Sequence, residues 1–126
     1  MGKKILIVDD SLVEIKILQS FLAETDYLIT VARNGEEGEA TAKTVAPDLI
    51  FLDVVMPKKN GFQVCRDLRK EPRFQQTPII MLTSKSQDTD KFWGMQQGAT
   101  DYITKPYEKQ QILEILRQYL SREQAE

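Results

Sequence analysis

Short runs of apolar residues alternate along this chain with longer stretches in which apolar residues recur every three or four positions. A continuous run is typical of a strand buried on both faces, whereas the longer spacing indicates a helix with one buried stripe. The runs predict strands over residues 3–8, 27–32, 48–53, 79–83 and 101–104. A first helix is predicted to begin near residue 11. Four more are predicted over about 36–45, between 61 and 71, over about 88–97 and over about 108–120. This alternation favours an α/β fold in which a parallel sheet is covered on both faces.

Local signals refine three of these helices. Ser11 and Glu14 match the S-x-x-E capping box, which places the start of the first helix at Ser11. The apolar stripe of that helix is expected to contain Leu12, Ile15, Leu18, Phe21 and Leu22. In the fourth helix Phe92 and Trp93 are adjacent. Because neighbouring helical residues point about 100° apart, both cannot easily face the core, and one is expected at the surface. The last helix is expected to bury Ile112, Ile115, Leu116 and Tyr119 and to leave a frayed polar tail over 121–126.

Composition limits the chemistry that this chain can perform. Its 126 residues suit a single domain over 1–126, with a core of about 3–122, and the net charge of −2 gives no basic footprint for nucleic acid. No apolar run approaches membrane-spanning length, and the single Cys65 fits a reducing cytoplasm. The absence of histidine excludes Ser-His-Asp and Cys-His catalysis and histidine metal ligands. Reactive groups must therefore be carboxylates, hydroxyls, lysines or a bound metal ion.

Such groups stand where the predicted strands end. Asp9 and Asp10 follow the first strand, Asp53 ends the third, Thr83 ends the fourth and Lys105 follows the fifth. The carboxyl ends of parallel strands open on one edge of the sheet, where ligands bind in α/β folds. Each residue alone has an ordinary structural explanation, as a loop acid, a helix-entry residue or a surface charge. Their occurrence together indicates a site.

The chemistry of this set favours a metal and a phosphoryl group. Three carboxylates in one pocket repel one another unless a cation joins them, and magnesium, or manganese in its place, prefers such oxygen ligands. The three carboxylates, a divalent cation and the Lys105 ammonium sum to about zero charge. A phosphoryl group could then be held by the metal, by Lys105 and by the Thr83 hydroxyl, and a carboxylate nucleophile would form an aspartyl phosphate.

Several motifs together give a specific family resemblance. They are VDDS at 8–11, LDVVMP at 52–57 with Gly61 beyond, LTS at 82–84 and GATDYITKP at 98–106. The chain resembles a response-regulator receiver domain of the single-domain chemotaxis type over about residues 3–122. The segment FWGMQQG at 92–98 is similar to receivers of pilus-associated, twitching-motility systems. The resemblance implies a doubly wound, flavodoxin-like fold with strand order 2-1-3-4-5.

The resemblance also implies roles for the acids. Asp53 would be the phosphoacceptor. Asp9, Asp10, Asp53 and the backbone carbonyl of Val55 would hold magnesium. Lys105 would contact the phosphoryl group, oriented by a cis Lys105-Pro106 peptide bond.

Four further positions would regulate the switch. Thr83 would move to hydrogen-bond a phosphoryl oxygen, and Tyr102 matches an aromatic residue that rotates inward on activation. Val55 and Lys85 stand where the family tunes the lifetime of the phosphoryl group. Valine cannot orient an attacking water, and lysine can shield the phosphoryl group. We therefore expect slower self-dephosphorylation than in a relative with Asn and Glu at these positions.

The resulting hypothesis is a stand-alone response regulator in the cytoplasm. Because the chain has no histidine, a histidine kinase or histidine phosphotransfer domain would supply the phosphoryl group. Phosphorylation would bias a two-state equilibrium, and the face made by the fourth helix, the fifth strand and the fifth helix would bind a downstream protein target. We expect no nucleic-acid or membrane binding, and a monomer or a weak phosphorylation-dependent dimer. The protein would be no enzyme beyond catalysing its own phosphorylation and dephosphorylation.

Two alternatives remain. The chain could be a pseudo-receiver that binds partners without phosphorylation, although such modules usually lack one of the acids or the lysine. A phosphatase of the haloacid-dehalogenase type also places an aspartate after a strand. That class needs a second acid two residues later, where this chain has Val55.

Overall fold

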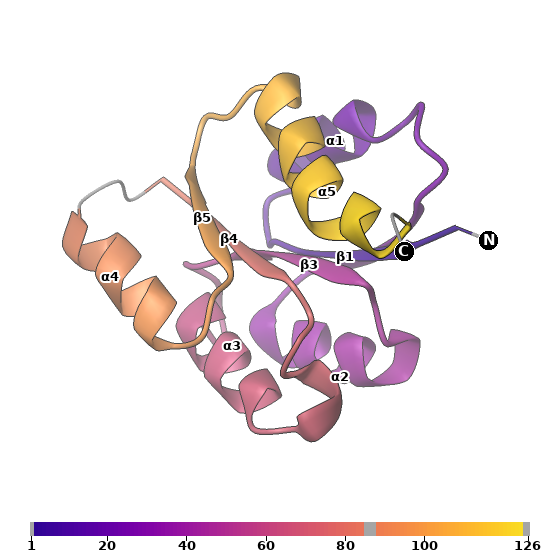
Figure 1. Ribbon diagram of the computed structural model, residues 1–126. Coiled ribbons are helices and arrows are strands. Elements are labelled where there is room, and N and C mark those ends of the chain that lie inside the picture. The colour runs from indigo at the N-terminus through magenta and orange to yellow at the C-terminus, as the bar shows by residue number, and fades with distance from the viewer. Residues whose placement is uncertain (1, 85–87, 125–126) are drawn as a thin grey trace.

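The apolar runs form one parallel sheet at the centre of the molecule. A computed structural model describes residues 2–84 and 88–124. The strands lie in the order β2-β1-β3-β4-β5, so the predicted fold class is confirmed (Figure 1). Their bounds are Lys4–Val8 for β1, Leu28–Ala32 for β2, Leu49–Asp53 for β3, Ile79–Thr83 for β4 and Asp101–Thr104 for β5.

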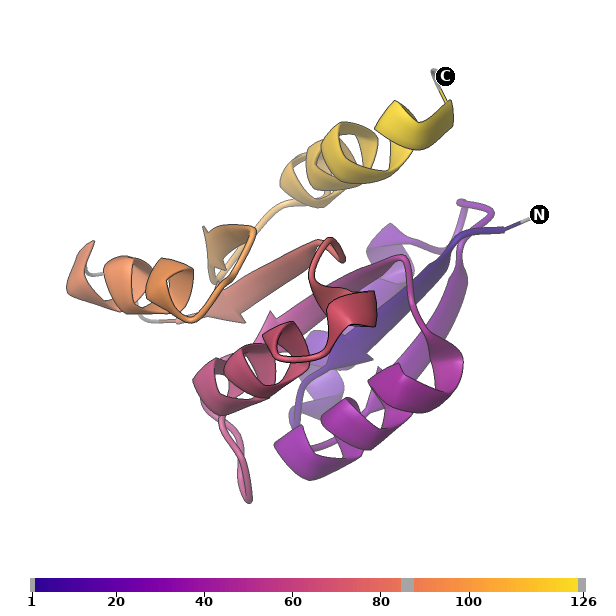
Figure 2. The same ribbon diagram turned by 60° about the horizontal axis from the view of Figure 1, so that its bottom comes forward.

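Helices cover the sheet on both faces. Helices α1 (Leu12–Phe21) and α5 (Lys109–Gln124) cover one face. Helices α2 (Gly35–Val45) and α3 (Gly61–Arg69) cover the other, followed by a short 3-10 turn η1 (Pro72–Phe74), and α4 (Asp88–Gln96) lies beside the edge strand β5 (Figures 1 and 2). The covering helices explain why every residue of β3 and β4 is buried.

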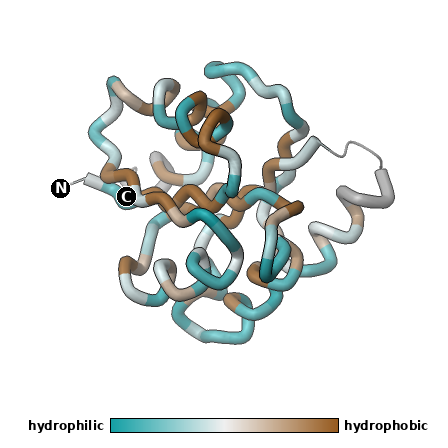
Figure 3. The backbone as a smooth tube through the Cα atoms, turned by 180° about the vertical axis from the view of Figure 1, so that it is seen from behind, coloured by the Kyte–Doolittle hydropathy of each residue, from teal (hydrophilic) through white to brown (hydrophobic). Residues whose placement is uncertain are grey.

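The side chains of each strand alternate between two apolar layers. In β1, Ile5 and Ile7 pack with α1 and α5, whereas Leu6 and Val8 pack with α2 and α3. Figure 3 shows that the most hydrophobic residues form a band through the middle of the molecule, where the strands lie. Burial on both sides keeps the strands, and with them their carboxyl ends, in fixed positions relative to one another.

Two expectations about the helices are wrong in detail. Leu12 does not join the buried stripe of α1 but is 55% exposed, because it is the first residue of the helix, at the edge of the sheet. Helix α5 continues to Gln124 rather than ending near residue 120, since residues 121–124 contain neither glycine nor proline to stop it. Among the described residues, no helix combines the length and the apolar character needed to span a membrane.

Candidate functional site

The strand order brings the predicted site residues to one edge of the sheet. Strands β1 and β3 are neighbours, with Val8 opposite Leu52, so Asp9 and Asp53 follow side by side. Strand β4 lies between β3 and β5, with Thr83 opposite Thr104, which brings Thr83 and Lys105 to the same edge. A site assembled from four strands thus arises from residues up to 96 positions apart in the sequence.

The three aspartates form a compact acidic cluster at this edge. One carboxylate oxygen from each of Asp9, Asp10 and Asp53 lies within 4.8 Å of the others. Asp9 and Asp53 are buried, while Asp10 is exposed to solvent. Converging carboxylate oxygens with an open side fit a hard divalent cation that keeps part of its water shell.

Lys105 places its ammonium group among these acids. Its Nζ atom is 3.1 Å from Asp9 Oδ2 and 3.2 Å from Asp53 Oδ1. The Lys105-Pro106 peptide is cis, as the resemblance implied, and the Lys105 amide donates to the Thr83 carbonyl at 2.7 Å. The lysine is therefore fixed to the end of β4 by its backbone and to the acids by its side chain.

Burial and charge shift the ionisation of the two central groups. Burial raises the pKa of Asp53 to about 6, and the nearby charge of Asp9 adds to the rise while Lys105 opposes it. Burial alone would lower the pKa of Lys105, but the charges of Asp53 and Asp9 outweigh that effect and raise the pKa. Asp53 is thus a buried carboxylate whose ionised form is favoured by the Lys105 ammonium beside it.

The loop that follows Asp53 is closed tightly over β3. The Gly61 amide donates to the Val54 carbonyl at 2.8 Å, and any side chain at Gly61 would collide with the Asp53 carbonyl oxygen. Lys59 in this loop forms ion pairs with Glu39 of α2 and Asp67 of α3. These contacts fix the backbone on which Asp53 and the following residues stand.

The remaining predicted residues lie around this centre. Thr83 is buried at the end of β4, and Tyr102 is half-buried on β5, opposite Met81. The Val55 side chain is 58% exposed. Lys85 lies outside the described residues. The positions of Thr83, Tyr102 and Val55 are compatible with their expected roles, which stay predictions.

Sequence reasoning missed the place of Glu14. The Ser11 hydroxyl accepts from the Glu14 amide, but the Ser11 amide donates to Asp9 Oδ1 at 3.0 Å, so only half of the expected capping box forms. The Glu14 carboxylate instead lies 3.9 Å from Lys105 Nζ. The signal was present in the sequence, since an aspartate two residues before an N-cap can take the amide that the box would use.

The Phe92-Trp93 pair forms an apolar surface on α4. Phe92 is 62% exposed and Trp93 57% exposed, and Met95 is exposed beside them. The expectation that one aromatic would reach the surface is exceeded, because both do. We call Phe92, Trp93 and Met95 the α4 surface.

Comparison with known proteins agrees with this architecture. Residues 5–117 match the family model of the response regulator receiver domain. The chain is 42% identical to protein PilH of Pseudomonas aeruginosa over 118 residues, which cover 94% of this chain and 98% of that protein. It spans about half the length of other curated relatives. One is the alkaline phosphatase synthesis transcriptional regulatory protein PhoP of Bacillus subtilis, at 43% identity over 89% of this chain and 46% of that protein.

Solved structures give the same result for the fold. The chemotaxis protein CheY4 of Vibrio cholerae superposes with a TM-score of 0.89 at 32% identity, covering 95% of this chain and 100% of that one. The receiver domain of the sensor histidine kinase PA1611 of P. aeruginosa gives 0.87 at 27% identity, over 94% and 98% of the two chains. That structure holds a magnesium ion in its active-site cleft. The predicted kinship with single-domain, chemotaxis-like receivers is confirmed.

Proposed function

Because this chain belongs to the response regulator receiver family of two-component signalling, we propose that it is a switch activated by phosphorylation of Asp53. The observation that carries the proposal is the contact of Asp53 Oδ1 with Lys105 Nζ at 3.2 Å, beside the carboxylates of Asp9 and Asp10. A carboxylate nucleophile, a cation that can bind phosphoryl oxygens and acids that can hold a metal occur together there.

Magnesium, or manganese in its place, fits this donor set. Asp9, Asp10 and Asp53 would bind it with their carboxylates, and Val55 would contribute its backbone carbonyl. When bound, the cation supplies positive charge to the phosphoryl oxygens. Lys105 supplies further positive charge from within the protein, and the hydrogen bond from its amide to the Thr83 carbonyl holds the end of β4 beside it, where the Thr83 hydroxyl would bind a phosphoryl oxygen.

The phosphoryl donor is another protein, a histidine kinase or a histidine phosphotransfer domain, because this chain contains no histidine. Leu12, Val13 and Val55 leave apolar side chains exposed on the segments that carry the acids, where a donor protein can dock. Phosphorylation then biases the positions of Thr83 and Tyr102, and with them the binding of a downstream protein through the α4 surface. The protein's own phosphorylation and dephosphorylation are the reactions that we assign to it.

The alternative is a pseudo-receiver that binds its partner without phosphorylation. The full set of acids and the lysine argues against it. Intact-mass measurement after incubation with acetyl phosphate and magnesium distinguishes the two, with Asp53→Asn as the matched control. We expect one added phosphoryl group that requires magnesium and is absent from Asp53→Asn. No adduct, either with rapid quenching or with a panel of histidine kinases, would favour the pseudo-receiver.

Val55 is proposed to lengthen the life of the phosphoryl group. Its exposed, apolar side chain can neither orient nor activate a water for attack on the acyl phosphate. We expect Val55→Asn to accelerate loss of the phosphoryl group by about tenfold, less than the roughly 10²–10⁴-fold of a full general acid or base, because an amide can orient a water but cannot deprotonate it. Decay of the phosphorylated mass after removal of acetyl phosphate measures it, and an unchanged decay rate would contradict the assignment.

A further inference from the structure

Glu14 brings a fourth carboxylate to the site, one that the proposed metal set does not use. Its Oε1 atom lies 3.9 Å from Lys105 Nζ. The Glu14 side chain is 30% exposed, compared with 14% for Lys105 and 10% for Asp53. Glu14 is therefore the most solvent-accessible of these three groups, and its charge is open to a phosphoryl donor that arrives from solvent.

The local structure of α1 leaves this carboxylate available. In α3 the corresponding residue of the first turn, Gln63, uses its side chain to accept from the N-cap amide of Asn60 at 3.2 Å. In α1 that amide, of Ser11, already donates to Asp9. Because the Ser11 amide donates to Asp9, the Glu14 carboxylate is not used for capping and lies beside Lys105 instead.

A fourth carboxylate changes the charge that a donor meets. Four carboxylates (−4), a divalent cation (+2) and the Lys105 ammonium (+1) sum to about −1 rather than zero. A donor whose leaving group departs as an anion is then repelled. A donor whose leaving nitrogen is protonated finds a carboxylate that can pair with it.

Tyr107 carries a hydroxyl whose pKa responds to the charge of Glu14. Its hydroxyl is buried and has no hydrogen-bond partner within residues 2–84 and 88–124. Burial raises the pKa of Tyr107, and the charges of Glu14, Asp9 and Asp53 add to the rise, so the hydroxyl stays neutral. Among these charges that of Glu14 contributes most, so the Glu14 carboxylate acts electrostatically at the same site as Asp9 and Asp53.

We propose that Glu14 is a specificity-determining residue that favours nitrogen-linked phosphoryl donors over acyl phosphates, an inference that rests on the function proposed above. In either transfer an Asp53 carboxylate oxygen forms the new bond to phosphorus. With phosphoramidate the P–N bond breaks, and the protonated nitrogen keeps the electron pair and leaves as neutral ammonia. With acetyl phosphate a P–O bond breaks, and the electron pair leaves on acetate.

The test compares Glu14→Gln with the parent on these two donors, at saturating magnesium, with the phosphorylation rate constant measured by intact mass. We expect the ratio of the acetyl phosphate rate to the phosphoramidate rate to rise by about tenfold, as loss of one nearby charge implies. Glu14→Ala should give the same ratio, because the charge and not the shape is decisive. The control is Glu36→Gln, which removes an exposed acid from the first turn of α2 and should leave the ratio unchanged.

Equal changes in both rates, or no change in either, would overturn the selectivity while leaving the switch intact. Disagreement between Glu14→Gln and Glu14→Ala would likewise overturn the role of charge. A parent protein that accepts a phosphoryl group from neither donor and from no kinase would overturn the proposed function itself, and the inference with it.

Discussion

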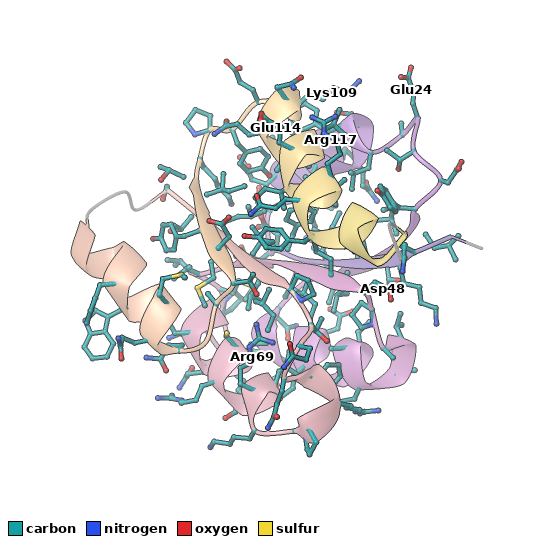
Figure 4. All side chains as sticks on the ribbon, viewed as in Figure 1. Glu24, Asp48, Arg69, Lys109, Glu114 and Arg117 are labelled. Atoms are coloured by element: carbon teal, nitrogen blue, oxygen red, sulfur yellow. The ribbon has the colours of Figure 1, made fainter. Side chains whose placement is uncertain are left out.

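Helix α4 lies beside the edge strand β5 and helix α5 follows that strand in the chain, yet the two helices are held in different ways. Helix α5 turns its charged residues Lys109, Glu114 and Arg117 to solvent (Figure 4) and buries four large aliphatic side chains. These are Ile112, Ile115, Leu116 and Leu120. In α4, where side chains are described for residues 92–96, only Gly94 is buried, and Phe92, Trp93 and Met95 are exposed.

The contact beneath α4 is correspondingly sparse. A methyl group built on Gly94 would lie 3.0 Å from Met81 Sδ and 3.2 Å from a ring carbon of Tyr102, so the bare helix backbone rests against both side chains. A helix that presents glycine to the sheet and aromatic rings to solvent gains little stability from burial. Helix α5 therefore belongs to the stable framework, whereas α4 is held more loosely, and we expect α4 to shift if Tyr102 moves on activation.

The largest expected effect comes from breaking the attachment of α5. Leu116 is 2% exposed in the apolar layer between α1, α5 and the sheet. Leu116→Ala removes buried methyl groups and leaves a cavity, which should lower the free energy of unfolding by about 2–5 kcal/mol. Urea denaturation measures the loss. Met95→Ala in α4 is the matched control, and an equal loss in that variant would refute the distinction between the helices.

A smaller effect is expected where α4 meets Tyr102. Gly94→Ala gains about 1 kcal/mol of helix propensity, which offsets a packing cost of similar size because Met81 is flexible and Tyr102 is only half-buried. We expect a net change within about 1 kcal/mol together with a displaced Tyr102 ring, visible in its side-chain NMR signals.

Gly38 of α2 provides the control for this substitution. A methyl group there would lie 2.6 Å from Cγ1 of buried Val8, the β-branched residue that ends β1. Gly38→Ala should therefore cost about 1–3 kcal/mol. If Gly94→Ala proved as costly, α4 would be packed as rigidly as α2.

The strands and the buried helix faces could be predicted well from the sequence, because burial makes apolar residues recur at a regular spacing. The apolar runs of β1, β3 and β4, and the stripe at Ile112, Ile115 and Leu116, were all recognised from spacing. The convergence of Asp9, Asp53 and Lys105 also followed, since parallel strands end at one edge. The order of the strands could be taken only from the family resemblance, because spacing along the chain does not say which strands are neighbours.

The features that were missed depend on competition between local partners. Glu14 had the sequence of a capping residue, and only the structure shows that Asp9 takes its amide partner. Leu12 had the spacing of a core residue but lies beyond the edge of the sheet. The sequence around Gly94 likewise gave no indication that the helix approaches Tyr102 through its backbone. Such outcomes depend on which of two available contacts forms in three dimensions.

The smallest expected effect on stability is that of Trp93, the chain's single tryptophan. Because its side chain is 57% exposed, Trp93→Ser should change the free energy of unfolding by less than about 0.5 kcal/mol, and a loss above about 1 kcal/mol would show that the indole is packed. In the parent, acrylamide should quench Trp93 fluorescence readily, and phosphorylation with acetyl phosphate and magnesium should change the quenching constant if α4 shifts. Asp53→Asn should show no such change. An altered quenching constant that Asp53→Asn abolishes would tie the loosely held helix to the phosphorylation site, whereas identical quenching before and after phosphorylation would leave α4 as fixed as α5.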